Sequence, residues 1–152
     1  MRARAIATEI DIAAVPETVW QVLCDWPRYP EWNPFIVGLH GRHRLGARLV
    51  ATLRYPGGAR ATLRPVVIEL SASQTLAWRS AALMPGLLDR EHRWRLEALA
   101  GGATRLHHDG AHSGVLLPLC GAGIQESARR GFLLMNEALK QRCETLASAA
   151  TA

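Results

Sequence analysis

Turn-forming residues divide the middle of the chain into segments of strand length, and this punctuation constrains the fold more than any other feature. Between residues 35 and 113, clusters such as Pro56-Gly57-Gly58 and Pro85-Gly86 separate intervals that carry β patterning. Connections this short favour antiparallel neighbours. The pattern predicts six strands, over residues 35–40, 47–55, 59–70, 75–81, 89–99 and 103–112.

One further strand and two short helices are expected before this region. Residues 4–13 alternate with the period of a half-buried strand. Pro16 suits the first turn of a helix that extends to Cys24. A second brief helix should reach about Trp32 and end there, because Pro34 pushes the residue before it out of the helical region.

The last segment, over residues 119–147, predicts a long amphipathic helix. Its apolar residues recur three and four positions apart, at Ile124, Ala128, Phe132, Met135, Leu139, Cys143 and Leu146. The opposite side carries charged residues and should face water. Gly121 and Gly123 are poor helix formers and leave the start of the helix undetermined.

Composition favours one ordinary globular domain. The chain has 152 residues, so residues 1–152 are expected to form a single domain. The net charge of +5 comes from scattered basic residues that form no run or aromatic-interleaved stripe, which argues against nucleic-acid binding. Cys24, Cys120 and Cys143 lie far apart without a Cys-x-x-Cys pair, so we expect no disulfide framework and a cytoplasmic location. No apolar run is long enough to span a membrane.

Local motifs in the same order point to a known family. They are the Trp- and Pro-rich segment 19–35 and the segments 86–94, 104–108, 113–116 and 130–136. Together with the order of elements, they resemble the SRPBCC or START-like superfamily, in particular bacterial polyketide cyclase/dehydrase-like members. The resemblance implies an α+β helix-grip fold, in which a seven-stranded curved antiparallel sheet wraps around a long C-terminal helix, with two short helices after strand one. It also implies an apolar pocket between sheet and helix.

Histidines and a tryptophan fall on the inward parity of the strands predicted over residues 89–99 and 103–112. His92 and Trp94 in the first strand alternate with charged residues that should face water. His108 and His112 have the inward parity in the second, and a short glycine loop would make the two sets neighbours. Because no carboxylate shares this parity and the spacing matches no zinc pattern, we expect hydrogen bonding to backbone, water or a ligand, and no metal.

The predicted ligand-binding residues are Trp32, Phe35, Trp78, Leu87, His92, Trp94, His108, Phe132 and Met135. By the resemblance, Trp32 and Phe35 lie near the cavity mouth, while Phe132 and Met135 belong to the helix that roofs the cavity. Leu87 lies in an apolar loop over residues 84–88 that is costly if exposed, and that loop is a candidate gate. For the tryptophans and the helix stripe, plain core packing is the alternative.

The leading hypothesis is a binding protein for a small hydrophobic molecule, aromatic or lipid-like, held between sheet and C-terminal helix. The alternative is a polyketide cyclase or aromatase that uses His92 or His108 as a proton shuttle. A third class is a chaperone- or partner-interaction module. No nucleophile motif or phosphate loop occurs, and we expect no cofactor. Similar family members often carry an acidic residue where this chain has Gly110, so this chain lacks that acidic group for the family's acid-base chemistry. An oligomer is compatible with the sequence.

Overall fold

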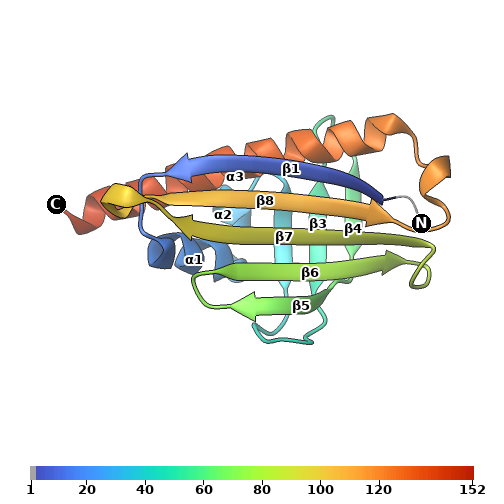
Figure 1. Cartoon of the computed structure of the whole chain (residues 1–152), viewed down its shortest axis with the longest axis horizontal. Helices are drawn as coiled ribbons and strands as arrows, with labels where there is room; N and C mark the ends of the chain where they lie inside the picture. Colours follow the sequence, from blue (N-terminus) through green and yellow to red (C-terminus); the bar gives the residue numbers. More distant parts are fainter. Residues whose placement is uncertain (1–2) are drawn as a thin grey trace.

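The computed structural model describes residues 3–152 and contains two antiparallel sheets (Figure 1). The larger sheet has the order β1-β8-β7-β6-β5, and the smaller sheet, with the order β2-β3-β4, crosses behind it in the figure. The strands of the larger sheet are β1 (Ala3–Ile12), β5 (Val66–Ser71), β6 (Thr75–Ala82), β7 (Leu88–Ala98) and β8 (Thr104–Ser113). Those of the smaller sheet are β2 (Ile36–His40), β3 (Val50–Arg54) and β4 (Arg60–Leu63).

The predicted sheet of seven strands is, within residues 3–152, eight strands in two sheets. A single strand over residues 59–70 was the wrong prediction, because the chain leaves the smaller sheet after Leu63 and enters the larger one at Val66. Pro65 lies at this corner, and its missing N–H cannot take part in a strand ladder. Its carbonyl accepts a hydrogen bond from the Leu49 N–H at 2.8 Å, so the two sheets stay connected.

Two short helices follow β1, as predicted. They are α1 (Pro16–Cys24) and α2 (Tyr29–Trp32), joined by the 3-10 turn η1 (Trp26–Arg28). The side chain of Asn33 ends α2, because its Oδ1 accepts hydrogen bonds from the N–H groups of Phe35 at 3.0 Å and Ile36 at 2.8 Å. This turn directs the chain from α2 into β2 and holds Phe35 against the core.

The long C-terminal helix α3 spans Ala122–Ala150, later than the predicted residues 119–147. Leu117–Leu119 instead form the 3-10 turn η3, which contains Pro118, and Gly121 precedes the helix in an extended conformation. Another 3-10 turn, η2 (Ala100–Gly102), joins β7 to β8. Helix α3 packs against β1, β8, α1 and α2, and Figure 1 shows it running along β1. Five of the seven residues predicted for its apolar face are buried, namely Ala128, Phe132, Met135, Leu139 and Cys143. Ile124 and Leu146, near the two ends of the helix, are exposed, and the prediction was wrong for them.

One hydrophobic core joins both sheets to the helices. Within residues 3–152 all three cysteines are free, and the reducing compartment inferred from them stays a prediction. None of the helices in that part of the chain has the length and apolar character needed to cross a membrane.

Candidate ligand-binding site

The inner face of the larger sheet carries the residues that the sequence placed there. His92, Trp94 and His108 have exposed fractions of 5%, 0% and 0%. The residues that directly flank them on the opposite parity, Arg93, Arg95, His107 and Asp109, are half-buried or exposed. The antiparallel register sets Trp94 opposite His108 and His92 opposite Gly110. Trp78 of β6 lies opposite His92 and is also buried. The predicted inward parity is therefore confirmed.

These side chains form a continuous aromatic cluster with Phe132 of α3. The Phe132 and His108 rings stack with centroids 3.9 Å apart and planes 6° apart. The Trp94 ring centroid lies 4.9 Å from that of His108 and 4.7 Å from that of Trp78. Phe132 also lies 5.0 Å from His92. At this level the rings fill the space between sheet and helix, where an open cavity was expected from the sequence.

Two glycines allow the rings to approach this closely. A Cβ atom at Gly110 on β8 would lie 2.7 Å from Cζ of Phe132. A Cβ atom at Gly131 on α3 would overlap the ring of Phe35. Glycine in a helix interior is less favourable than alanine by about 1 kcal/mol, so the close packing of Phe35 is the physical reason for a glycine here. The closed interior is thus encoded by small residues as well as by large ones.

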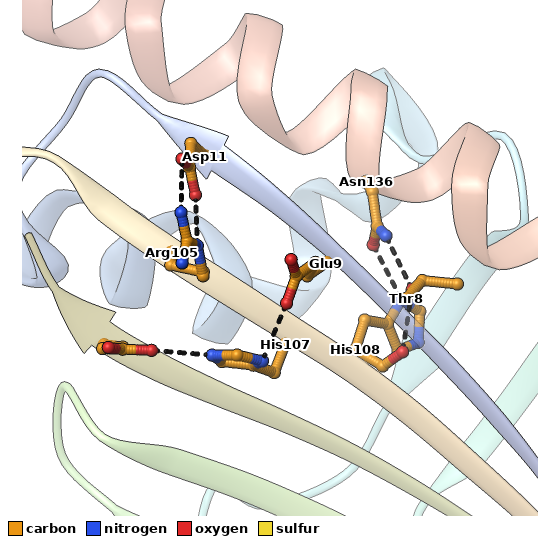
Figure 2. Close-up of polar contacts among 8 residues, drawn as sticks. Thr8, Glu9, Asp11, Arg105, His107, His108 and Asn136 are labelled. Carbon is orange, nitrogen blue, oxygen red and sulfur yellow. Dashed lines mark hydrogen bonds and ion pairs between the residues drawn. The ribbon is translucent and has the colours of Figure 1, made fainter.

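A hydrogen-bond relay holds His108 from two other elements, as Figure 2 shows. Its Nδ1 lies 2.8 Å from Oδ1 of Asn136 on α3. The Asn136 amide nitrogen donates to Thr8 Oγ1 on β1 at 2.9 Å, and the Thr8 hydroxyl donates to the His108 carbonyl at 2.8 Å. All three residues are buried. The relay therefore fixes the imidazole ring relative to both sheet and helix.

Burial keeps the inner histidines neutral. Loss of hydration lowers the pKa of His108 to about 3, and its hydrogen bond to Asn136 opposes this only in part. The pKa of His92 is lowered well below its ordinary value by burial first, and then by the neighbouring histidines and Arg90. Burial, followed by repulsion from Arg90, also lowers the pKa of His112. The site therefore presents uncharged imidazoles at neutral pH.

Four ring nitrogens of the cluster have no hydrogen-bond partner within residues 3–152. They are Nε1 of Trp78, Nε1 of Trp94, Nδ1 of His92 and Nε2 of His108. Most buried polar atoms in folded proteins are paired, and leaving one unpaired costs about 1–3 kcal/mol. These four nitrogens are therefore available to a polar group that enters the interior.

A small pocket opens at the end of the inner face, beside the start of α3. Its lining comes from β1, β7, β8, η3 and α3, and consists of Arg4, Leu88, Arg90, His112, Leu117, Cys120, Gly121, Ile124 and Gln125. Its volume of about 20 Å³ holds about one water molecule. His112 is the inward-facing residue that follows Gly110 on β8, and Gly110 lies under Phe132. The pocket is therefore at the edge of the aromatic cluster.

Phe35 and Met135 are buried in the same region. The Phe35 ring lies 5.7 Å from Phe132 and stacks at 6.4 Å on His92, and Met135 is fully buried on α3. Seven of the predicted residues thus share one buried region: Phe35, Trp78, His92, Trp94, His108, Phe132 and Met135. Contact of these side chains with a ligand stays a prediction.

Trp32 and Leu87 lie outside the aromatic cluster. Trp32 is half-buried and lines a surface groove between α1 and the C-terminal part of α3. Leu87 is half-buried in the loop between β6 and β7, where its carbonyl accepts a hydrogen bond from the Leu116 N–H at 2.9 Å. Its neighbour Leu88 lines the small pocket. Leu87 is therefore near the small pocket, whereas Trp32 packs against the hydrophobic core from the surface, with its ring 5.1 Å from that of Tyr29. Contact of either side chain with a ligand stays a prediction.

The sequence interpretation did not single out Thr8 or Asn136 as site residues. Each carried the same signal, a polar residue on an otherwise apolar face. Thr8 shares its strand face with isoleucines, and Asn136 follows Phe132 by four residues on the buried side of α3. A buried polar residue needs a partner, but only tertiary contacts show which one.

The inner histidines do not form a metal centre with other residues of the described chain. Within residues 3–152, no three histidine, cysteine, aspartate or glutamate side chains gather where they could hold a metal ion. The chemistry available on this face is hydrogen bonding by neutral imidazole and indole groups in an apolar setting.

Antiparallel sheets packed against a long C-terminal helix are the arrangement of the helix-grip class of proteins. The chain belongs to the polyketide cyclase / dehydrase and lipid transport family, whose model matches residues 3–148. The predicted membership of the START-like superfamily, as a polyketide cyclase-like member, is thereby confirmed. Among curated proteins, none matches the sequence significantly.

Several solved structures share the fold with little sequence identity. A START superfamily protein from Mycobacterium smegmatis is 22% identical, with a TM-score of 0.74, and the match covers 93% of this chain and 98% of that one. The Zhui aromatase/cyclase from Streptomyces sp. R1128 is 17% identical, with a TM-score of 0.75 and 94% of both chains covered. The di-domain ARO/CYC StfQ from the steffimycin biosynthetic pathway is 15% identical, with a TM-score of 0.75 over 96% of this chain. This chain spans about half of StfQ, 52% of its length.

Proposed function

We propose that the protein binds a small, largely apolar molecule, aromatic or lipid-like, between the larger sheet and α3. The observation that carries this proposal is the set of unpartnered ring nitrogens on the inner aromatic face. A mostly apolar ligand with a few polar groups would pair these atoms and keep the rings out of water. Family membership supports the proposal, since the family description includes polyketide cyclisation and lipid transport.

Ligand binding requires the closed interior to open. Phe132 is the ring that must move, because it stacks on His108 and covers Gly110. The small pocket beside the start of α3 borders this ring cluster. We therefore place the entrance there, with the loop that contains Leu87 at its rim.

The domain organisation of the chain, its cellular location and the kind of partner that it binds are also proposals. A single domain over the chain is supported by one core and by the family match to residues 3–148. A cytoplasmic location is supported by the free cysteines of the described chain. A small hydrophobic partner suits the aromatic interior, whereas the scattered positive charge gives nucleic acid no continuous surface.

Native mass spectrometry of freshly purified protein tests the proposal. We expect a retained small molecule, and quenching of tryptophan fluorescence when that molecule is returned to the emptied protein. Leu88→Trp narrows the small pocket and should weaken binding at least about tenfold. Leu119→Trp, at a position 82% exposed and outside that pocket, is the matched control and should leave affinity unchanged. The proposal fails if no molecule is retained and no apolar aromatic or acyl probe binds.

Polyketide cyclase or aromatase activity is the second candidate, and it is favoured by a buried imidazole nitrogen, Nε2 of His108, that has no hydrogen-bond partner within residues 3–152. A pKa of about 3 makes this imidazole a weak base, whereas general-base catalysis is most efficient when the pKa is near the working pH. The gap between the His108 pKa and a neutral working pH favours binding over catalysis. His108→Ala separates the candidates, because an enzyme should lose turnover while a carrier should lose one hydrogen bond, about tenfold in affinity.

A further inference from the structure

The hydrogen bonds of Thr8 fix the orientation of the Asn136 amide. The Thr8 hydroxyl donates to the His108 carbonyl at 2.8 Å, because a carbonyl oxygen can only accept. Its lone pairs must then receive the contact from Asn136 at 2.9 Å, so the amide atom on that side is the nitrogen. The amide oxygen of Asn136 consequently faces His108 Nδ1 at 2.8 Å.

This orientation selects one tautomer of His108. Because the Asn136 oxygen only accepts, Nδ1 of His108 must carry a proton. Since the ring is neutral, Nε2 has a lone pair and no hydrogen. Nε2 is also the atom of this ring that has no partner within residues 3–152, and the residue is fully buried. Thr8 and Asn136 are thus positioning residues that decide whether His108 offers a donor or an acceptor to the interior.

We propose that Nε2 of His108 is a selective acceptor, and that the ligand presents a neutral hydroxyl group to it, as a phenol, an enol or an alcohol. This inference rests on the proposed function and deepens it by naming the ligand class. A carbonyl, ether or carboxylate oxygen at this place would bring two lone pairs together. A charged group would lose its hydration among aromatic rings. Planar hydroxylated aromatic molecules fit this combination of a dry, ring-lined interior and one acceptor.

A role of the relay in packing alone explains less of the structure. The bond between Thr8 and Asn136 is enough to tie α3 to β1. It does not need an imidazole whose second nitrogen is buried without a partner. Trp94 and Phe132 both stack on this ring and limit its rotation, so Nε2 is held in the interior. The arrangement maintains an acceptor that a ligand can use.

The tautomer is tested in the free, intact chain by long-range ¹H–¹⁵N correlation NMR. In the wild type we expect a protonated Nδ1 and an unprotonated Nε2 at His108. Thr8→Val removes the lone pairs that orient Asn136, so its amide can rotate and the opposite tautomer should gain population. Thr8→Ser is the conservative variant and should restore the wild-type spectrum. A protonated Nε2 in the wild type overturns the inference and leaves the proposed binding function standing.

The ligand class is tested with 2-naphthol and 2-methoxynaphthalene, which differ by one hydrogen-bond donor. The wild type should bind 2-naphthol about tenfold more tightly, the effect of one buried hydrogen bond. In Thr8→Val this ratio should fall below about twofold, and Thr8→Ser should recover it. Equal binding of the two probes by the wild type overturns this inference alone. If neither probe nor any other apolar molecule binds, the proposed function fails and this inference fails with it.

Discussion

His107 and His108 are neighbours on β8, but they lie on opposite faces of the sheet in opposite surroundings. His107 points outward, and its Nδ1 lies 3.6 Å from Glu9 (Figure 2). Its Nε2 lies 2.9 Å from Glu97. His108 points inward, is fully buried and is hydrogen-bonded to Asn136. One step along the pleat thus separates a charged, solvated network from a dry aromatic interior.

The two faces differ in the same way along neighbouring strands. On the outer face Glu91 accepts hydrogen bonds from Arg79 and Arg93, and Arg105 makes two hydrogen bonds to Asp11. Burial alone would raise the pKa of Glu91, but the hydrogen bonds from the two arginines lower it further than burial raises it. Water solvates these outer groups in any case, whereas a polar atom on the inner face depends on a specific partner. The inner face is therefore where a ligand can be selected.

The largest expected difference between the faces is in stability. Trp94→Ala removes a fully buried indole and should lower the free energy of unfolding by about 3–5 kcal/mol. Arg95→Ala, at the next and exposed residue of β7, should change it by at most about 0.5 kcal/mol. Urea denaturation of both variants measures this contrast. A loss below about 1 kcal/mol for Trp94→Ala would show that the inner face is not a packed interior.

Acid should destabilise the fold through the inner histidines. The pKa of His108 is lowered from 6.5 to about 3, so below pH 6.5 the unfolded state binds a proton that the folded state does not. The contribution of His108 to the free energy of unfolding is fully present above pH 6.5 and is lost as the pH falls toward 3. Between pH 7 and pH 5 the free energy of unfolding should fall by about 2 kcal/mol through this group. The lowered pKa values of His92 and His112 act in the same direction.

Urea denaturation at pH 7, 6 and 5 measures this loss of stability. His108→Gln should remove the part of the pH dependence that His108 contributes. Equal stability of the wild type at pH 7 and pH 5 would contradict a buried, neutral imidazole at this position.

The packing of Phe132 over Gly110 gives a smaller effect. Gly110→Ala should lower the free energy of unfolding by about 1–2 kcal/mol, because its Cβ would crowd the tip of the Phe132 ring at 2.7 Å. Calorimetric or urea unfolding of the variant measures this loss. In a Phe132→Leu background the same substitution should have little effect, since the ring is gone. Equal losses in both backgrounds would mean that the crowding arises elsewhere.

The smallest effect is expected on the outer face. Glu91→Gln should lower the free energy of unfolding by at most about 1 kcal/mol, since both of its ion pairs are partly solvent-exposed. The difference in free energy of unfolding between the wild type and Glu91→Gln should shrink in 1 M NaCl, where the screening length is about 3 Å. Urea denaturation at low and high salt measures it. A salt-independent loss as large as that of Trp94→Ala would remove the distinction between the faces.

Periodicity explains what could be predicted. The inward parity of His92, Trp94 and His108 follows from the two-residue repeat of a strand, and the buried stripe of α3 from the helical repeat. The order of elements and the motifs led to the family. The break at Pro65 was missed because its flanking residues keep a strand pattern although the chain changes sheets there.

The candidate site was predictable only in part. Large inward residues could be named, but whether rings leave a cavity or close on one another depends on their mutual distances. The close approach of Phe132 depends on Gly110 from another element, and the partner of Asn136 is Thr8, 128 residues away in sequence. No local pattern contains either pairing.

The sequence by itself determined the family, the class of fold and the face of each strand that is buried, because these depend on local order and on repeats of two and of about 3.6 residues. Only the tertiary structure decided that the interior is closed and that His108 presents an acceptor to it. Both depend on atoms from β1, β8 and α3 that meet only when the chain folds, and on hydrogen-bond directions that exist only at that contact.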